Sequence, residues 1–458
     1  MPDLATIKHL LRRTEYVARP HRVGQLSGLA TLEQCVDDIL AVPADPGSVV
    51  FRESEPYLQG EELVHFWLDR MAHDSPRPIQ ERMAFFWHGH FCSELNKVHG
   101  PVPMREQIDT FRREGFGNLR TLTKRISRQI AMLRYLDNNL NQKASPNENF
   151  GRELMELFLL GVGNYTEQDV RASALAWTGH TDTQGMQGVY VWRGEWHDSS
   201  PKSLLGGTIN TNGAPQDHGD QVIDHILSGG VVPGGAARNV GRPTREVAAE
   251  FISRKLWIEF AGTQPPQSVL DHLRSVAVAN NFEIRPWVRA LLLHPEFYST
   301  STRQGLVRSP VSFVVAVLVA NGLRSNPNVA MWRLPGMGQM PLYPPDVSGW
   351  PHNEGFLNAA SVAQRMGFVR DIAYRVMPGY WGGDGLIHLA GGTISQHEVE
   401  NVYPDRPDLL TDRFLELMRV DVSPTTRDVL VRHAQNSLPW ERVDLVSLIL
   451  SAPEFQMM

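Results

Sequence analysis

The sequence is poor in cysteine, and it also lacks long apolar runs and an excess of basic charge. Its 458 residues include two cysteines, Cys35 and Cys92, which lie far apart and outside any Cys-x-x-Cys pair. Two such cysteines cannot form a disulfide framework for a chain of this length, and they give no support for redox chemistry. No stretch approaches the roughly 18 uninterrupted apolar residues of a membrane helix, so no membrane span is expected.

The charge balance bears on nucleic-acid binding, and the first residues bear on the location of the protein. The formal net charge is −6 and the pI is near 6.3, which argues against nucleic-acid binding, because that function needs a clustered basic surface. The segment Met1–Lys8 has no basic region, long apolar core or small-residue cleavage site, so it does not resemble a signal peptide. The cytoplasm is therefore the expected location.

The hydrophobic pattern predicts a mainly α fold, a large irregular helical domain with a small β-hairpin insertion. Hydrophobic residues make up 42% and charged residues 21% of the chain, which is ordinary globular composition. A 3.6-residue period predicts helices over most of the chain, at 4–14, 31–41, 60–72, 78–92, 104–115, 119–135, 147–161, 166–178, 244–261, 266–279, 285–294, 309–322, 356–377, 406–419, 424–436 and 440–451.

Two regions depart from this helical pattern. The stretch 181–215 is rich in Gly, Thr, Asn and Trp, and Val189–Trp192 predicts a strand of a small hairpin or flap. The stretch 324–353 is dense in Pro, Gly and Met and is expected to be a loop. We predict an N-terminal helical region (1–180) with the candidate site, a β/loop insertion (181–242) and a C-terminal helical region (243–458), packed as one body.

The segment 81–91 carries the first candidate site. Glu81 and His88 fall on one stripe of a helix that is apolar around most of its circumference, whereas His90 points to the other side. A carboxylate and an imidazole on one stripe can ligate a metal ion or act as an acid/base pair. The alternative is that the histidines are hydrogen-bonded core residues.

The segment 147–158 carries the second candidate site. Glu148, Arg152 and Glu156 are spaced i, i+4, i+8, so that each acid can reach the arginine. Glu153 lies beside this ladder and shares a stripe with Asn149. Three acids and one arginine on a largely apolar helix indicate buried, paired charge, which either orders the fold or serves a site.

Together these two helices suggest a site with a divalent metal ion as a possible cofactor. The proposed metal ligands are Glu81, His88, Glu153 and Glu156, and the proposed catalytic residues are His88, Arg152 and Glu153. Arg152 would orient an anionic substrate or its acidic neighbours.

Three further candidates lie outside these helices. His197 and Asp198, with Lys202 nearby, lie in the expected flap and either close over a ligand or form a solvated turn. Asp346 and Trp350 lie in a Pro-bounded loop. They either line a pocket, or Trp350 anchors the loop to the body.

Several of these segments resemble motifs of one family, the domain-of-unknown-function family 1800, in the family's order. The motifs are His9–Thr14, Phe86–Phe91, Tyr135–Asn138, Asn147–Gly163, Tyr165–Val170, His197–Asp198, Phe251–Leu256, Arg308–Val311 and Pro344–Pro351. Two positions depart from the family pattern. Gly89 replaces the usual asparagine between the histidines, and His180 replaces the usual tryptophan after Gly179, which adds His180 to the candidate pocket residues.

The resemblance implies a partner but no reaction. Genes of this family often lie beside those of family 1501, whose members resemble alkaline phosphatases and sulfatases, so a partner protein of that kind is expected. Members of family 1800 are often exported, unlike what the first residues of this chain predict. Two functions stay open: an enzyme with a polar or metal-binding site between the two helices, and a non-catalytic helical scaffold or partner of a sulfatase- or phosphatase-like protein.

Overall fold

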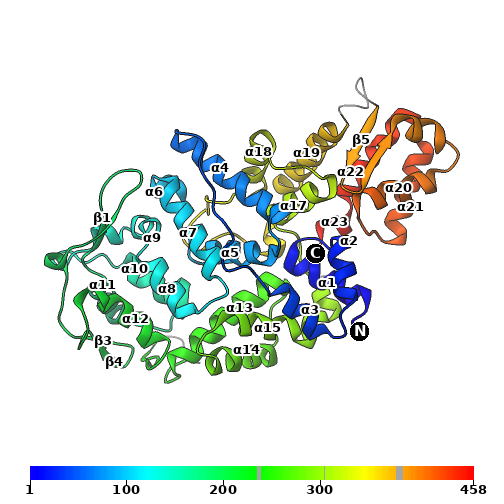
Figure 1. Cartoon of the computed structure of the whole chain (residues 1–458). Coiled ribbons are helices and arrows are strands. Elements are labelled where there is room, and N and C mark those ends of the chain that lie inside the picture. The colour runs from blue at the N-terminus through cyan, green and yellow to red at the C-terminus, as the bar shows by residue number, and fades with distance from the viewer. Residues whose placement is uncertain (235–238, 304, 378–384) are drawn as a thin grey trace.

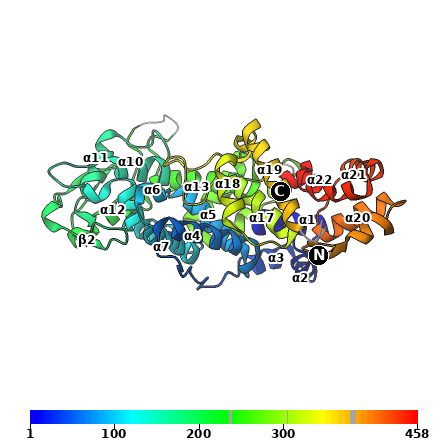
Figure 2. The same ribbon diagram turned by 90° about the horizontal axis from the view of Figure 1, so that it is seen from above.

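The computed structural model has an elongated body made almost entirely of helices (Figures 1 and 2), which confirms the predicted mainly α class. It describes residues 1–234, 239–303, 305–377 and 385–458, with the backbone alone at 327–330. None of the described helices is long and apolar enough to cross a membrane.

The N-terminal third forms the first helices of the central body. They usually begin at Pro or at a side-chain cap such as Asp3 or Thr31, which satisfy or remove free N–H groups of the first turn. These elements are α1 (Leu4–Glu15), α2 (Pro20–Ser27), α3 (Leu32–Ile39), α4 (Pro56–Asp69), the π-helix η1 (Arg70–Asp74) and α5 (Pro78–His90).

One end of the molecule gathers short helices and two hairpins (Figure 1). It comprises α6 (Leu95–Val98), α7 (Pro101–Glu114), α8 (Leu119–Ser127), α9 (Ile130–Tyr135), η2 (Asn138–Leu140), α10 (Asn149–Glu153), the π-helix η3 (Leu154–Leu159), α11 (Glu167–Ala176), β1 (His180–Asp182), β2 (Tyr190–Trp192), η4 (Gly194–Trp196), β3 (Lys202–Leu204), β4 (Gly207–Ile209), η5 (Pro215–Asp217) and α12 (His218–Ile226).

The remaining helices complete the centre and build the other end. The centre continues with α13 (Thr244–Ala261), α14 (Gln267–Ala279), α15 (Ile284–Leu293), η6 (Pro295–Tyr298), α16 (Thr300–Arg303), α17 (Pro310–Asn321), α18 (Pro327–Met337), η7 (Asn353–Phe356) and α19 (Ala359–Val376). The far end holds β5 (Leu386–Leu389), β6 (Gly392–Ser395), η8 (Glu398–Val402), α20 (Pro407–Met418), α21 (Pro424–Asn436), η9 (Pro439–Asp444), α22 (Leu445–Ser451) and α23 (Pro453–Gln456).

All strands pair as small antiparallel hairpins. β1 pairs with β2 through His180 opposite Trp192, β3 pairs with β4, and β5 pairs with β6. The predicted insertion therefore holds two hairpins and helix α12, not a single hairpin, and β5–β6 was not predicted. Residues 235–238 of the insertion lie outside the described residues.

The expected loop at 324–353 is wrong in part, because it contains helix α18. Pro327 is compatible with the first helical turn, where its missing N–H costs nothing. Pro335 lies near the other end of the helix, and Gly338 caps it with φ +89°. The predicted helix 119–135 is also divided, into α8 and α9, because Gln129 has extended backbone.

Most of the buried apolar side chains in the described residues belong to one cluster that runs from Ile7 to Phe455. Backbone hydrogen bonds also join distant segments: Leu119 donates to Phe282, and Met458 donates to Leu306. This continuity places α5, η3 and α13 side by side around the candidate site, although they are far apart in sequence. The three-region division of the chain stays a prediction.

Candidate functional site

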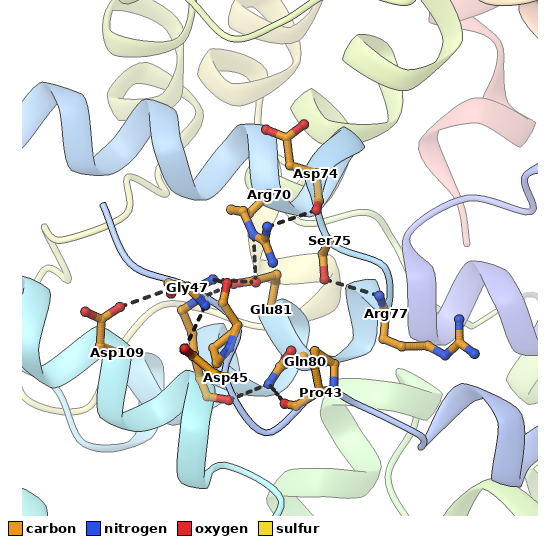
Figure 3. A network of polar contacts seen from close by, with 12 residues as sticks. Pro43, Asp45, Gly47, Arg70, Asp74, Ser75, Arg77, Gln80, Glu81 and Asp109 are labelled. Atoms are coloured by element: carbon orange, nitrogen blue, oxygen red, sulfur yellow. Dashed lines mark hydrogen bonds and ion pairs between the residues drawn. The ribbon is translucent and has the colours of Figure 1, made fainter. Parts of the chain in front are cut away.

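Glu81, in the first turn of α5, lies in a network of polar contacts and not in a pair with His88 (Figure 3). Its carboxylate is fully buried and accepts hydrogen bonds from Arg112 Nε at 2.8 Å and Nη2 at 3.0 Å. Arg70 Nε adds a third contact at 3.4 Å. Arg112 in turn donates to Asp109 and to the carbonyl of Gly47. The carboxylate is thus occupied by two arginines.

His88 is a buried residue of the core with one hydrogen bond. Its Nε2 accepts the backbone N–H of Leu342 at 3.1 Å, and its ring contacts Trp67 and Trp350. The proton of the neutral ring is therefore on Nδ1, which has no hydrogen-bond partner among the described residues. Burial lowers the pKa of His88 to about 3, so the ring stays neutral at physiological pH.

His90 points to the opposite side of α5, as predicted, and meets a lysine there. Its Nε2 donates to the carbonyl of Phe158 at 2.9 Å, which leaves a lone pair on Nδ1. Nζ of Lys255, from α13, lies 3.2 Å from this Nδ1 and donates to it. Burial holds the pKa of His90 well below its ordinary value. The imidazole is therefore a fixed, neutral acceptor for the lysine.

Lys255 is held by acceptors that carry no charge. Besides His90, its Nζ donates to the carbonyl of Leu157 at 3.0 Å, and it lies 4.9 Å from the ring centre of Phe251. Within the part of the chain that the structure describes, it forms no ion pair with a carboxylate. Burial lowers its pKa to about 8, because no counter-charge offsets the desolvation of the ammonium.

Lys255 lines a cavity of about 400 Å³ between α5, η3, α13 and the loop before η7. Trp350 closes one side, stacked on Phe85 with the ring centres 5.2 Å apart. This loop approaches α5 so closely that a Cβ at Gly349, where φ is +89°, would lie 2.4 Å from the carbonyl oxygen of Gly89. Most of the wall is apolar, and its polar side chains include Tyr16, Arg82, His90, Glu156, Lys255, Gln339 and His352.

The second predicted helix is wound differently from what its sequence suggests. α10 continues into the π-helix η3, after which Gly161 and Gly163 adopt positive φ and Thr166 caps α11 with a capping box. Such wide turns occur often at functional sites. In this protein, the π-helix η3 directs the carbonyl of Leu157 toward Lys255 and the carbonyl of Phe158 toward His90.

The predicted ladder on this helix is wrong in its burial and in the pair of Arg152 with Glu156, whereas the pair of Arg152 with Glu148 is present. Arg152 binds Glu167 at 2.6 Å and Glu148 more loosely at 3.5 Å. Glu156 instead accepts a hydrogen bond from Tyr165. Burial, followed by the charge of Glu156, raises the pKa of Glu153. Asn149 is exposed.

The flap residues form a separate buried group. His197 Nδ1 donates to the carbonyl of Thr178, and its Nε2 lies 2.9 Å from Nδ1 of His218. His180 contacts the hydroxyl of Tyr190 at 2.9 Å. The ion pair of Asp198 with Lys202 spans 2.8 Å. Nε2 of His180 is buried without a hydrogen-bond partner among the described residues. The group lies outside the cavity lining.

Of the loop pair, Trp350 lines the cavity and Asp346 does not. Asp346 is exposed, and its carboxylate accepts a hydrogen bond from the backbone N–H of Ser348 at 2.8 Å. Among the predicted residues, the cavity therefore brings together His90, Glu156 and Trp350. The predicted metal set is not assembled, and no group of three or more His, Cys, Asp or Glu within the described ranges is arranged to hold a metal ion.

Lys255 is the main residue that the sequence analysis missed. It lies within the motif Phe251–Leu256, on a helix whose neighbouring positions Ile252, Leu256 and Trp257 are buried. A lysine among these buried apolar positions was the available signal. Its contact with His90 spans 165 positions and has no local signature.

The helical body defines a mainly α class of protein, and a comparison with known families gives the particular family. The family model described as "Protein of unknown function (DUF1800)" matches residues 9–457, nearly the whole chain. The chain belongs to this family, as its motifs predicted. No curated protein and no solved structure is similar enough to the chain to match it.

Proposed function

We propose that this protein is an enzyme that acts on a carbonyl compound in the cavity between α5, η3 and α13, with the amine of Lys255 as the nucleophile. One observation carries this proposal: Lys255 faces the cavity and is held only by uncharged acceptors. Most buried cations in proteins are paired with acids, so an unpaired amine at a cavity wall is a candidate for chemistry.

The two hydrogen bonds suit the neutral form of the amine. A neutral amine has two N–H bonds and one lone pair. The carbonyl of Leu157 and Nδ1 of His90 accept the two N–H bonds. The lone pair is then left free, and the cavity is the space open to it. His90 acts here as a positioning residue, because its own Nε2–H is fixed on Phe158.

The expected reaction begins with imine formation. The lone pair of Lys255 attacks the carbonyl carbon of the substrate, a C–N bond forms, and the carbonyl oxygen leaves as water with the two hydrogens of the amine. The resulting imine, once protonated, withdraws electrons from the adjacent carbon and activates the bonds there. The apolar wall and the Trp350 roof limit the access of water to this intermediate.

Trapping the imine tests this function. Purified protein is incubated with hexanal or 2-oxohexanoate and sodium cyanoborohydride, and the modified peptide is identified by mass spectrometry. We expect modification of Lys255 in the wild type, and its loss in Lys255→Arg. Lys143→Arg, a change at an exposed lysine, is the matched control. Equal labelling of Lys143 and Lys255 would contradict the proposal.

A non-catalytic role as a helical partner of a sulfatase- or phosphatase-like protein is the second candidate. The fully paired network around Glu81 supports it, because such a network orders helices without needing a ligand. This candidate predicts no adduct at Lys255 and co-elution with a protein of family 1501. The partner, the divalent metal and the cytoplasmic location stay predictions.

A further inference from the structure

A second group of buried cations lies where α1, α17, α19 and the C-terminal residues meet. Arg13, Arg308 and Arg365 are exposed by 0%, 4% and 1%, respectively. Within the described ranges, none of the three forms an ion pair with a carboxylate. Their partners are the carbonyls of Phe260, Thr302, Phe455, Tyr16 and Arg308, and the side-chain amide of Gln456.

Arg308 is the member of this group that faces a cavity. Its Nε donates to the carbonyl of Phe455 at 3.0 Å, and its Nη1 donates to the carbonyl of Tyr16 at 2.6 Å. Nη2 has no hydrogen-bond partner among the described residues. Burial, and then repulsion from Arg12 and other neighbouring arginines, lowers the pKa of Arg308 to about 9. The group therefore carries positive charge that the fold leaves without a counter-charge.

The cavity beside Arg308 has a volume of about 200 Å³ and an excess of positive charge. Its lining contains four arginines, Arg12, Arg19, Arg308 and Arg419, and two acids, Asp421 and Glu454. Both acids are already engaged. Asp421 binds Lys8 and Arg12, and Glu454 accepts from Ser423 and Thr426.

The rest of the wall is apolar. Its apolar lining includes Ala316, Val319 and Ala320 of α17, together with Val17 and Met418. An anion that fits here must therefore combine a small charged group with a short hydrocarbon part. A guanidinium offers parallel N–H donors that match the two oxygens of a carboxylate.

We infer that this cavity, here named the Arg308 cavity, binds a short-chain carboxylate whose charged group meets Nη2 of Arg308 and whose chain lies against α17. Arg419, which is exposed and has no ion pair among the described residues, adds attraction at the mouth. The site is separate from the one at Lys255. Tyr16 lies between them, with its carbonyl on Arg308 and its side chain in the wall of the Lys255 cavity.

Calorimetric titration of the full chain with hexanoate tests this inference. Hexan-1-ol serves as the uncharged probe and inorganic phosphate as the anion without a chain. We expect hexanoate to bind at least about thirtyfold more tightly than hexan-1-ol, because a buried charge gains its partner. Arg308→Gln should remove this preference.

A milder variant keeps the test decisive if Arg308→Gln does not fold. Arg419→Gln removes an exposed charge at the mouth and should weaken hexanoate binding about threefold. Arg171→Gln, at another exposed arginine on α11, should leave it unchanged. The inference is overturned if hexanoate binds no better than hexan-1-ol or if phosphate binds as tightly as hexanoate. It is also overturned if Arg419→Gln and Arg171→Gln bind hexanoate with the same affinity.

Discussion

Arg112 and Lys255 are both cations enclosed beside α5, but their surroundings differ. Arg112 faces the carboxylates of Glu81 and Asp109, and its remaining donors reach backbone carbonyls. Lys255 faces an imidazole, a carbonyl and a cavity. A buried charge that is fully paired stabilises the fold, whereas one without a counter-charge costs stability and is retained for another reason. The family motifs include His90 and Lys255 but neither Glu81 nor Arg112.

The largest expected effect comes from breaking the paired region. Arg112→Met leaves Glu81 as a buried carboxylate with only the longer contact to Arg70, so we expect a loss of about 3–5 kcal/mol in the free energy of unfolding. Denaturant unfolding followed by circular dichroism measures it. Arg427→Met, which removes an exposed pair with Asp412, should cost less than about 1 kcal/mol. Equal losses would mean that the network does not order the fold.

Acid should weaken the fold through the neutral core histidines. The pKa of His88 is about 3 in the folded state and near 6.5 when unfolded. The unfolded chain therefore binds more protons in this window, and stability falls as the pH drops from about 6.5 toward 3. Between pH 6 and 4 we expect His88 to contribute a loss of about 2 kcal/mol.

The variant His88→Gln isolates this contribution, because the amide can still accept the N–H of Leu342 but does not titrate. Unfolding free energies of both proteins are compared across the pH range. Curves of equal slope for wild type and variant would show that His88 is not the group responsible.

Lys255 should have a smaller effect, in a different pH range. Its pKa is about 8 in the folded state and near 10.4 when unfolded. The unfolded chain binds more protons between these values, so stability rises as the pH increases from about 8 to 10. Because the side chain is partly exposed to the cavity, we expect a gain of about 1 kcal/mol over this range.

Lys255→Met removes this rise, and its stability at pH 7 should equal or exceed that of the wild type. Thermal unfolding at pH 7, 8, 9 and 10 provides the comparison. A variant that is several kcal/mol less stable at every pH would identify Lys255 as a structural tie between α13 and η3.

The smallest effect is expected at Arg152, which the sequence placed in the site. Its pairs with Glu167 and Glu148 are on the surface, so Arg152→Gln should change the free energy of unfolding by less than about 1 kcal/mol. Labelling of Lys255 should not change. If the variant kept its fold but lost the labelling of Lys255, Arg152 would have a role in the reaction, as the sequence analysis proposed.

These differences show which features the sequence could predict. A local signal succeeded: the opposite directions of His88 and His90 on α5 follow from helix geometry. The sequence did not predict the π-helix η3, because the average helical period does not distinguish it from an α-helix. It did not predict helix α18 either, because tertiary packing outweighed the high Pro and Gly content of that segment.

The site itself depended on contacts that no local pattern contains. Glu81 lies on the same stripe as His88, but its partner Arg112 arrives from another helix. Arg152 was expected to be buried because its apolar neighbours are numerous, yet it lies on the exposed side of the helix. The pairing of Lys255 with His90 requires the packing of α13 against α5, which spacing along the chain does not determine.

The pKa of Lys255 tests the central claim most directly. The chain has six lysines, so a protein labelled with ¹³C-lysine gives few Cε signals, and Lys255→Met assigns the relevant one. We expect the Lys255 signal to titrate near pH 8, more than two pH units below the ordinary lysine pKa of about 10.4. Titration of Lys255 above pH 10 would contradict the account of an unpaired catalytic amine.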